Sequence, residues 1–444
     1  MFKIFANAWR VEDIRKKMLF IFLLLFIYRI GAILVPLPGL DLEVLNNARY
    51  ISGTDSGVTT LFSLLMGGEL GTVFAMGIAP YITASIIMQL LTYAIPTLSR
   101  MQKEDEEGRK KIGQITRYLA VGLAVLQAAG TVFSYTRHNN GEINLFSSPN
   151  DNMFVYIVAT VAMTTGTMFI MWLAELLTEK GIGSGASFLI FANILAGLPA
   201  GAWTFWNMIT AEFGIVSVLT VAVLLLTFAL IIAFVVLVHE GERRIPVQYS
   251  RKAASGGRGM FGGNHNSYIP LKVNIAGVLS IIFAMSLISF PVQIAQFFPG
   301  TVENPSFISR VAAYVDFSDL HWVGAILYII LIFAFTHFYT SFAVNPIEMA
   351  ENMKKNGGFI PGIRPGKPTS EFIQTTVNRL SWIGACFYSL IAMTPILMGM
   401  LVPEMSRIAF GGTSLLIVTG VALEFVKQLE SQLLMRHYKG FLES

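Results

Sequence analysis

Ten apolar segments, each close to the length needed to cross a lipid bilayer, recur along this chain of 444 residues. A spanning helix needs roughly 20 predominantly apolar residues, because the hydrocarbon layer is about 30 Å thick. The ten segments are residues 18–35, 71–95, 119–135, 153–174, 182–198, 214–238, 273–291, 322–344, 381–401 and 411–426. Within lipid every backbone polar group needs an internal hydrogen bond, so these segments are predicted to be helices. The chain is therefore predicted to be an all-α polytopic membrane protein with ten transmembrane helices.

The composition agrees with burial in a membrane. Hydrophobic residues make up 54% of the chain and charged residues only 13%, whereas soluble domains carry about 25% charged residues. The single cysteine, Cys386, lies in an apolar segment and has no partner for a disulfide within the chain. Residues 1–17 are polar and basic, lack the pattern of a cleavable signal, and are predicted to form an amphipathic helix at the membrane surface.

The distribution of Lys and Arg predicts the orientation of the ten helices. Of the 31 Lys and Arg residues, 26 fall in segments on the side of the N-terminus. The other five are Arg29 inside the first apolar segment and, on the opposite side, Arg49, Arg137, Arg310 and Arg407. Loops rich in Lys and Arg remain in the cytoplasm. Both termini are therefore predicted to be cytoplasmic.

Two cytoplasmic loops, at about residues 239–272 and 345–380, are long and basic. In the first, Ile245, Val247 and Tyr249 occupy alternate positions and so share one face, as do Ile269, Leu271 and Val273 after a Gly-rich stretch. This period of two predicts a β-hairpin that projects into the cytosol. The second loop contains paired glycines and three prolines and is predicted to be irregular, with a rigid bend at 360–366. Basic loops often serve only to orient the chain or to meet anionic lipid, but the length of these two favours docking of a large partner.

Motifs for catalysis are weak or absent from the sequence. The sequence GRGMFG at 257–262 fits a dinucleotide-binding pattern but lacks the strand and helix that such a site requires. The six histidines are scattered without metal-ligand spacing: His138, His239, His265, His321, His337 and His437. We therefore expect neither an enzyme, nor a metal site, nor a cofactor. Any transported substrate must be driven by a partner or by a gradient.

A short apolar segment at about 59–69 is too short to span the bilayer and too apolar for an ordinary loop. Its apolar residues and the two glycines that follow them are Leu61, Phe62, Leu64, Leu65, Gly67 and Gly68. Half-length helices at membrane depth are tolerated only where protein surrounds them or where they line a cavity. In the next segment Ile78 and Ile82 are four residues apart and share one helical face. Periodicity alone leaves open whether that face meets lipid or lines a pore.

Several motifs in a fixed order resemble the SecY/Sec61 family of protein-conducting channels. They are GIAPYITASIIMQLL at 77–91, GIGSGASFLIFANILAGLP at 181–199, ERRIPVQYSRK at 242–252, GFIPGIRPGKPT at 358–369 and GGTSLLI at 411–417. The resemblance covers nearly the whole chain. It implies two pseudo-symmetric halves of five helices, residues 1–200 and 201–444, around a central pore. The outer link near 199–213 would be the hinge between the halves.

The resemblance also implies roles for particular residues. The segment 59–69 corresponds to a plug that closes the pore from the outer side, with Gly67 and Gly68 as its hinge. The matching pore ring consists of Ile78, Ile82, Ile190, Ile282 and Ile417. The matching lateral gate, through which apolar segments leave for the lipid, consists of Thr83, Gln89, Gln127, Asn274 and Phe290. The matching docking residues for a motor or a ribosome are Arg243, Arg244, Arg251 and Arg364.

By the same resemblance the chain sits in the bacterial plasma membrane and conducts unfolded polypeptides outward. The partners implied are the small membrane subunits SecE and SecG, the ATPase SecA, the ribosome, a signal peptide or nascent chain, and lipid. The main alternative is a secondary transporter, a class that also uses repeats and broken helices. A transporter is expected to carry ionisable groups near the middle of the membrane, and the apolar segments have few beyond Arg29, His337 and Glu424.

Overall fold

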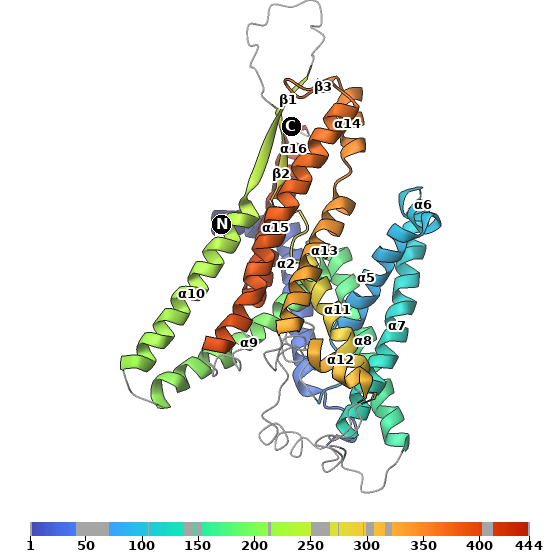
Figure 1. The fold of residues 1–444 in the computed structure, drawn as a ribbon, viewed down its shortest axis with the longest axis vertical. Helices are drawn as coiled ribbons and strands as arrows, with labels where there is room; N and C mark the ends of the chain where they lie inside the picture. Colours follow the sequence, from blue (N-terminus) through green and yellow to red (C-terminus); the bar gives the residue numbers. More distant parts are fainter. Residues whose placement is uncertain are drawn as a thin grey trace, which may run out of the picture.

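The computed structural model describes residues 2–40, 71–104, 106–136, 146, 153–211, 215–249, 267–273, 275–295, 297–298, 306–315, 322–401 and 412–442. The expected plug at 59–69 lies outside these residues, as do Arg251 and Asn274. The described chain is helical apart from one small sheet (Figure 1).

Each of the ten predicted spans contains a helix. These helices are α2 (Glu12–Leu34), α5 (Ala79–Ala94), α7 (Glu106–Thr136), α8 (Met153–Lys180), α9 (Gly185–Ala211), α10 (Ile215–Glu240), α11 (Leu279–Ala295), α13 (Trp322–Ala343), α15 (Lys367–Leu401) and α16 (Gly412–Leu442). Among the described helices, α2, α7, α8, α10 and α13 are by themselves long and apolar enough to cross a bilayer. Before them, α1 (Phe2–Arg10) is an amphipathic helix that covers the first part of the one expected at residues 1–17, whereas residues 12–17 begin α2.

The second span differs most from its prediction. Residues 71–78 form turns, and α5 begins only at Ala79. Pro80 explains this start, because a proline in the first helical turn lacks only an N–H that has no partner there in any case. At its other end α5 meets α6 (Pro96–Glu104) at a bend of 108°. Ile95 adopts an extended backbone at the bend, since a residue before proline avoids the helical region.

Two further boundaries were predicted wrongly. The link expected at 199–213 is helical as far as Ala211, because α9 continues through Pro199. Membrane helices tolerate an internal proline because neighbouring groups satisfy the freed carbonyl. The seventh span begins at Leu279 and not at 273. A short helix that was not predicted, α12 (Phe307–Val315), precedes α13.

The predicted hairpin is present. Strands β1 (Glu242–Tyr249) and β2 (Ser267–Lys272) pair antiparallel, with Ile245 opposite Ile269. Ile245 and Val247 are buried as the alternation predicted, but Tyr249 is exposed. Tyr249 ends the strand opposite Gly358, and its ring covers the space that a side chain at Gly358 would fill.

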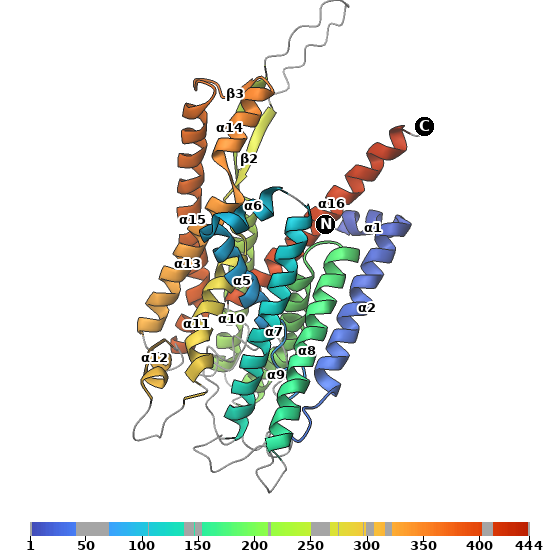
Figure 2. The ribbon, with the colours of Figure 1, turned by 90° about the vertical axis from the view of Figure 1, so that its right-hand side faces the viewer.

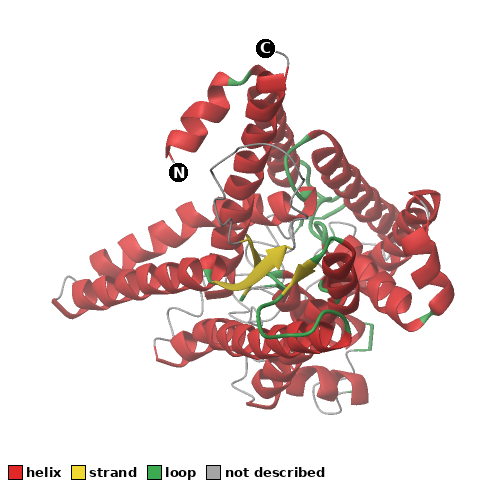
Figure 3. Ribbon diagram, turned by 90° about the horizontal axis from the view of Figure 1, so that it is seen from above, coloured by secondary structure: helices red, strands yellow, loops and turns green. Residues whose placement is uncertain are grey.

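The second basic loop is more regular than predicted, and it joins the first. It contains α14 (Pro346–Lys355) and strand β3 (Gly358–Phe359), which adds to β1. Ile245 and Val247 of the hairpin, Met353 of α14 and Ile373 of α15 share one buried cluster. The two loops therefore form a single subdomain, which stands at one end of the bundle (Figure 1) and lies over the middle of the helices when seen from above (Figure 3).

The ten helices that lie in the predicted spans pack in two groups. Helices α2, α5, α7, α8 and α9 pack against one another, and α11, α13, α15, α16 and α10 form a second set of contacts. Figure 2 shows α11 beside α5, with α7, α8 and α2 following in order. The groups meet on one side where α5 and α7 contact α11, and on another where α9 contacts α16. We call the first of these sides, where α5 and α7 face α11 and where Tyr93 of α5 also contacts Phe338 of α13, the seam.

Candidate functional site

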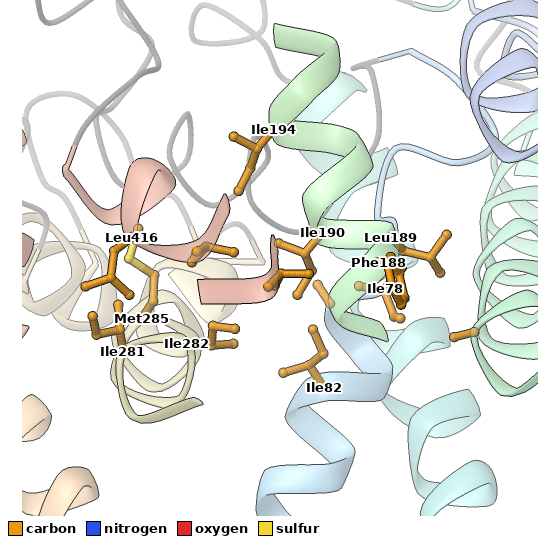
Figure 4. Packing of buried hydrophobic residues seen from close by; sticks show 14 of the residues in the cluster. Ile78, Ile82, Phe188, Leu189, Ile190, Ile194, Ile281, Ile282, Met285 and Leu416 are labelled. Carbon is orange, nitrogen blue, oxygen red and sulfur yellow. The ribbon is translucent and has the colours of Figure 1, made fainter. Parts of the chain in front are cut away.

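The five isoleucines expected to form a pore ring belong to one buried cluster. Ile78 directly precedes α5, and the other four come from α5, α9, α11 and α16. Their exposed fractions are 1% for Ile78, 7% for Ile82, 2% for Ile190, 6% for Ile282 and 1% for Ile417. Figure 4 shows Ile82, Ile190 and Ile282 pointing toward one another from α5, α9 and α11. We call these five residues the constriction. It joins the two helix groups through aliphatic side chains alone.

Ile78 and Ile82 remain in register although α5 begins after Ile78. The N–H of Ile82 donates to the carbonyl of Ile78 at 3.1 Å, so Ile78, the residue just before α5, accepts the first hydrogen bond of the helix. Their spacing of four residues therefore places both side chains on one face, as predicted.

A second layer of apolar residues supports the constriction, and the sequence reasoning did not identify it. Ile194 lies one turn from Ile190, and Ile281, Met285 and Leu416 lie beside Ile282 (Figure 4). The i, i+4 spacing of Ile190 with Ile194 and of Ile281 with Met285 was the signal available in the sequence. These residues belong to the same buried cluster as the ring.

Four of the five residues expected at a lateral gate are described, and they belong to α5, α7 and α11, but their described hydrogen bonds do not cross the seam. The hydroxyl of Thr83 donates to the carbonyl of Ala79 at 3.1 Å, within α5. Gln89 Nε2 lies 3.5 Å from Ser85 Oγ, also within α5. Gln127 Nε2 is buried and has no hydrogen-bond partner in the described part of the chain, and Phe290 is exposed on α11. The described hydrogen bonds of Thr83 and Gln89 therefore stay within α5.

Aromatic contacts cross the seam instead. The rings of Tyr93, at the end of α5, and Phe338, in α13, meet edge to face with centroids 5.2 Å apart. Further along, the ring of Phe297 lies so close to Gly130 of α7 that a Cβ there would stand 2.7 Å from Phe297 Cε2. Sequence reasoning did not single out these four residues, because no local pattern pairs them.

The exposed arginines of the two-loop subdomain are held in defined places. Arg244 Nε lies 2.6 Å from Glu242 Oε1, and its guanidinium stands 4.9 Å from the centre of the Tyr268 ring. Arg364 lies in a tight bend between two glycines with positive φ, Gly362 and Gly366. Its carbonyl accepts a hydrogen bond of 2.9 Å from the Thr369 hydroxyl. The bend predicted around Arg364 is therefore present.

Within the ranges given above, no three His, Cys, Asp or Glu side chains gather as metal ligands would. What the described residues do bring together is an aliphatic constriction, an apolar seam and a basic subdomain at one end.

These features define a class: a polytopic membrane protein whose two helix groups meet at an aliphatic constriction, as in a channel. A family model, SecY, matches residues 72–426. The chain belongs to the SecY family.

Relatives and solved structures agree with this assignment. The protein translocase subunit SecY of Streptomyces galbus is 41% identical over 447 residues, covering all of both chains. That of Bacillus subtilis is 38% identical over 453 residues, again covering all of both chains. The structure titled "The structure of a protein conducting channel" matches with a TM-score of 0.64 at 17% identity, covering 93% of this chain and 90% of its own. Sec61 in a canine ribosome–channel complex matches with a TM-score of 0.60 at 16% identity, covering 93% and 90%.

Proposed function

We propose that this chain is the pore-forming subunit of a protein translocase, which conducts unfolded polypeptides across the membrane and releases apolar segments sideways into lipid. Full-length similarity to translocase subunits supports this, and it favours a channel over a secondary transporter. A channel subunit needs no catalytic centre of its own, because a partner supplies the energy.

The single observation that carries the mechanism is the constriction. Branched alkyl side chains around a narrow opening disfavour water and ions by dewetting. They also offer no hydrogen bonds that would hold a passing chain. Such a ring closes around many kinds of side chain and keeps ions out while a polypeptide moves through.

The seam is the proposed lateral exit. Its described cross-contacts include the Tyr93–Phe338 ring pair and the close approach of Phe297 to Gly130, both of which are apolar. An apolar segment gains several kcal/mol when it enters lipid, at about 0.3–0.6 kcal/mol for each Leu, Ile, Phe or Val. That gain exceeds the cost of separating one or two aromatic contacts of about 1 kcal/mol each.

The remaining parts of the proposal rest on the family. The termini and the two-loop subdomain face the cytoplasm of a bacterial cell, in agreement with the bias of Lys and Arg. The subdomain would dock SecA or the ribosome through Arg243, Arg244, Arg251 and Arg364. The ribosome is also part of the complex named for a structural neighbour. SecE and SecG would complete the channel, and segment 59–69 would be its plug.

Replacing one constriction residue tests the proposal. Ile282→Asn places a polar amide where the alkyl ring excluded water, so we expect a higher resting ion conductance in planar bilayers. We also expect transport of preproteins with defective signal sequences. Leu287→Asn is the matched control, because Leu287 lies on the same helix α11 with 46% of its surface exposed. Wild-type conductance and signal stringency in Ile282→Asn would overturn the proposed role of the constriction.

A further inference from the structure

Residues 71–78, which we call the entry segment, connect to α5 without being helical and are attached firmly to the end of α2. The N–H of Leu37 donates to the carbonyl of Gly71 at 2.9 Å, and the N–H of Val73 donates to the carbonyl of Val35 at 3.1 Å. These two bonds make an antiparallel bridge in which Pro36 is opposite Thr72. Beyond the bridge the segment proceeds by tight turns to Ile78.

The entry segment lies on two glycines from two different helices. At Gly166, in the middle of α8, an added Cβ would stand 2.8 Å from Val73 Cγ1 and 3.0 Å from the Val73 carbonyl carbon, and closer still to its oxygen. At Gly31, near the end of α2, an added Cβ would stand 2.9 Å from Cε2 of the Phe74 ring. Only a residue without a side chain permits such close approach at both places.

The entry segment determines where the constriction begins. Phe74 and Ile78 are buried in the same cluster as the rest of the constriction, while Met76 is buried in a separate cluster between α7 and α8. Ile78 is followed directly by α5. The carbonyl of Ile78 accepts the first hydrogen bond of that helix, from the N–H of Ile82. A displacement of the entry segment away from α8 would therefore move Ile78 and Ile82 together, because closely packed interiors transmit a shift and do not absorb it.

We propose that Gly166 and Gly31 are positioning residues for the constriction: they let the entry segment settle against α8 and α2, and thereby hold Ile78 and Ile82 at the closing position. This inference rests on the proposed function, since it assigns a consequence for ion sealing to two glycines that do not themselves line the constriction.

The two glycines differ in what they touch, which predicts an order of effects. A methyl group at Gly166 meets main-chain atoms of Val73, so the backbone must shift. A methyl group at Gly31 meets the edge of the Phe74 ring, which can tilt. Gly166→Ala is therefore expected to raise the resting conductance several-fold and Gly31→Ala to raise it less. Phe74→Leu shortens the side chain above Gly31 and should bring Gly31→Ala back toward wild type, without correcting Gly166→Ala.

A matched control lies on the neighbouring helix. Gly122 is a glycine within α7, and a Cβ added there would meet no atom within 4 Å. Alanine is also the better helix former, by about 1 kcal/mol. Gly122→Ala should therefore leave the resting conductance at the wild-type level.

The experiment compares these variants as the intact purified complex in planar bilayers, with the resting conductance measured before any substrate is added. Membrane accumulation and thermal unfolding are measured in parallel, so that loss of folded protein is separated from leakage. We expect the resting conductance to be highest in Gly166→Ala, lower in Gly31→Ala and at the wild-type level in Gly122→Ala. Phe74→Leu should lower the conductance of Gly31→Ala but not that of Gly166→Ala. If Gly166→Ala does not accumulate, the rescue of Gly31→Ala decides the question.

Ile282→Asn serves as the reference for a leaking channel. If it leaks while Gly166→Ala, accumulated normally, and Gly31→Ala both stay at the wild-type conductance, the positioning role is refuted and the channel function stands. Leakage of Gly31→Ala that Phe74→Leu does not relieve would also refute the positioning role. If Ile282→Asn itself does not leak, the proposed role of the constriction fails first.

Discussion

Replacing Phe338 by alanine removes the ring contact that joins α13 to α5 across the seam. An edge-to-face aromatic pair contributes about 0.5–1.5 kcal/mol beyond the area it buries. Tyr93 keeps 65% of its surface exposed, so we take the lower part of that range, about 0.5–1 kcal/mol. Since 1.4 kcal/mol corresponds to a factor of ten, the equilibrium between a closed and an open seam should shift about two- to fivefold toward the open form.

The assay is a double-mutant cycle on the transport of a preprotein with a weakened signal sequence. Tyr93→Ala and Phe338→Ala should each raise its transport rate about two- to fivefold, and the double variant should add little, because either change alone removes the same contact. Phe333→Ala is the control, because Phe333 also lies on α13. Its ring centroid is 5.6 Å from that of Trp382 in α15, so this contact stays within one helix group. The reasoning is refuted if the effects of Tyr93→Ala and Phe338→Ala simply add, or if Phe333→Ala raises the rate as much.

Three further outcomes are expected. Deletion of residues 59–69 should raise the resting conductance in planar bilayers while export continues, and an unchanged conductance would exclude this segment as the plug. Arg364→Lys should slow ATP-dependent transport into vesicles, because lysine keeps the charge but lacks the planar five-donor group of arginine; transport at the wild-type rate would reduce Arg364 to a residue that only orients the chain. Ile373→Ala should destabilise the two-loop subdomain by about 2–4 kcal/mol, since a buried isoleucine leaves a cavity, and hydrogen exchange of β1 and β2 should rise while that of α8 stays the same.

Much of the architecture could be predicted from the sequence. Hydrophobic length identified a helix for each of the ten spans, because a chain segment in lipid has no solvent to satisfy its backbone and must do so locally. The alternation at Ile245 and Val247 identified the hairpin for a similar reason, since side chains of a strand alternate between its two faces. The bend at Arg364 followed from prolines and glycines that restrict or free the backbone. Each of these properties is decided within a few residues of the chain.

Local signals failed where a neighbour far along the chain decides the conformation. Residues 71–78 are as apolar as the helix that follows, yet they are not helical. Thr72 pairs with Pro36, and the backbone of Val73 lies against Gly166. The second basic loop was expected to be irregular, but its residues 358–359 form strand β3. This strand pairs with β1, which lies more than 100 residues earlier in the chain.

The residues of the candidate site were likewise predicted only in part from the sequence. Family resemblance, carried by short motifs, named five isoleucines, and periodicity alone related only Ile78 to Ile82. That Ile190, Ile282 and Ile417 share their cluster is a consequence of how α9, α11 and α16 converge. The ring pair of Tyr93 and Phe338 has no trace in any local pattern. Hydropathy and backbone preference act residue by residue and so can be read along the chain, whereas a contact depends on which surfaces the packed helices bring together, and only the tertiary structure decides that.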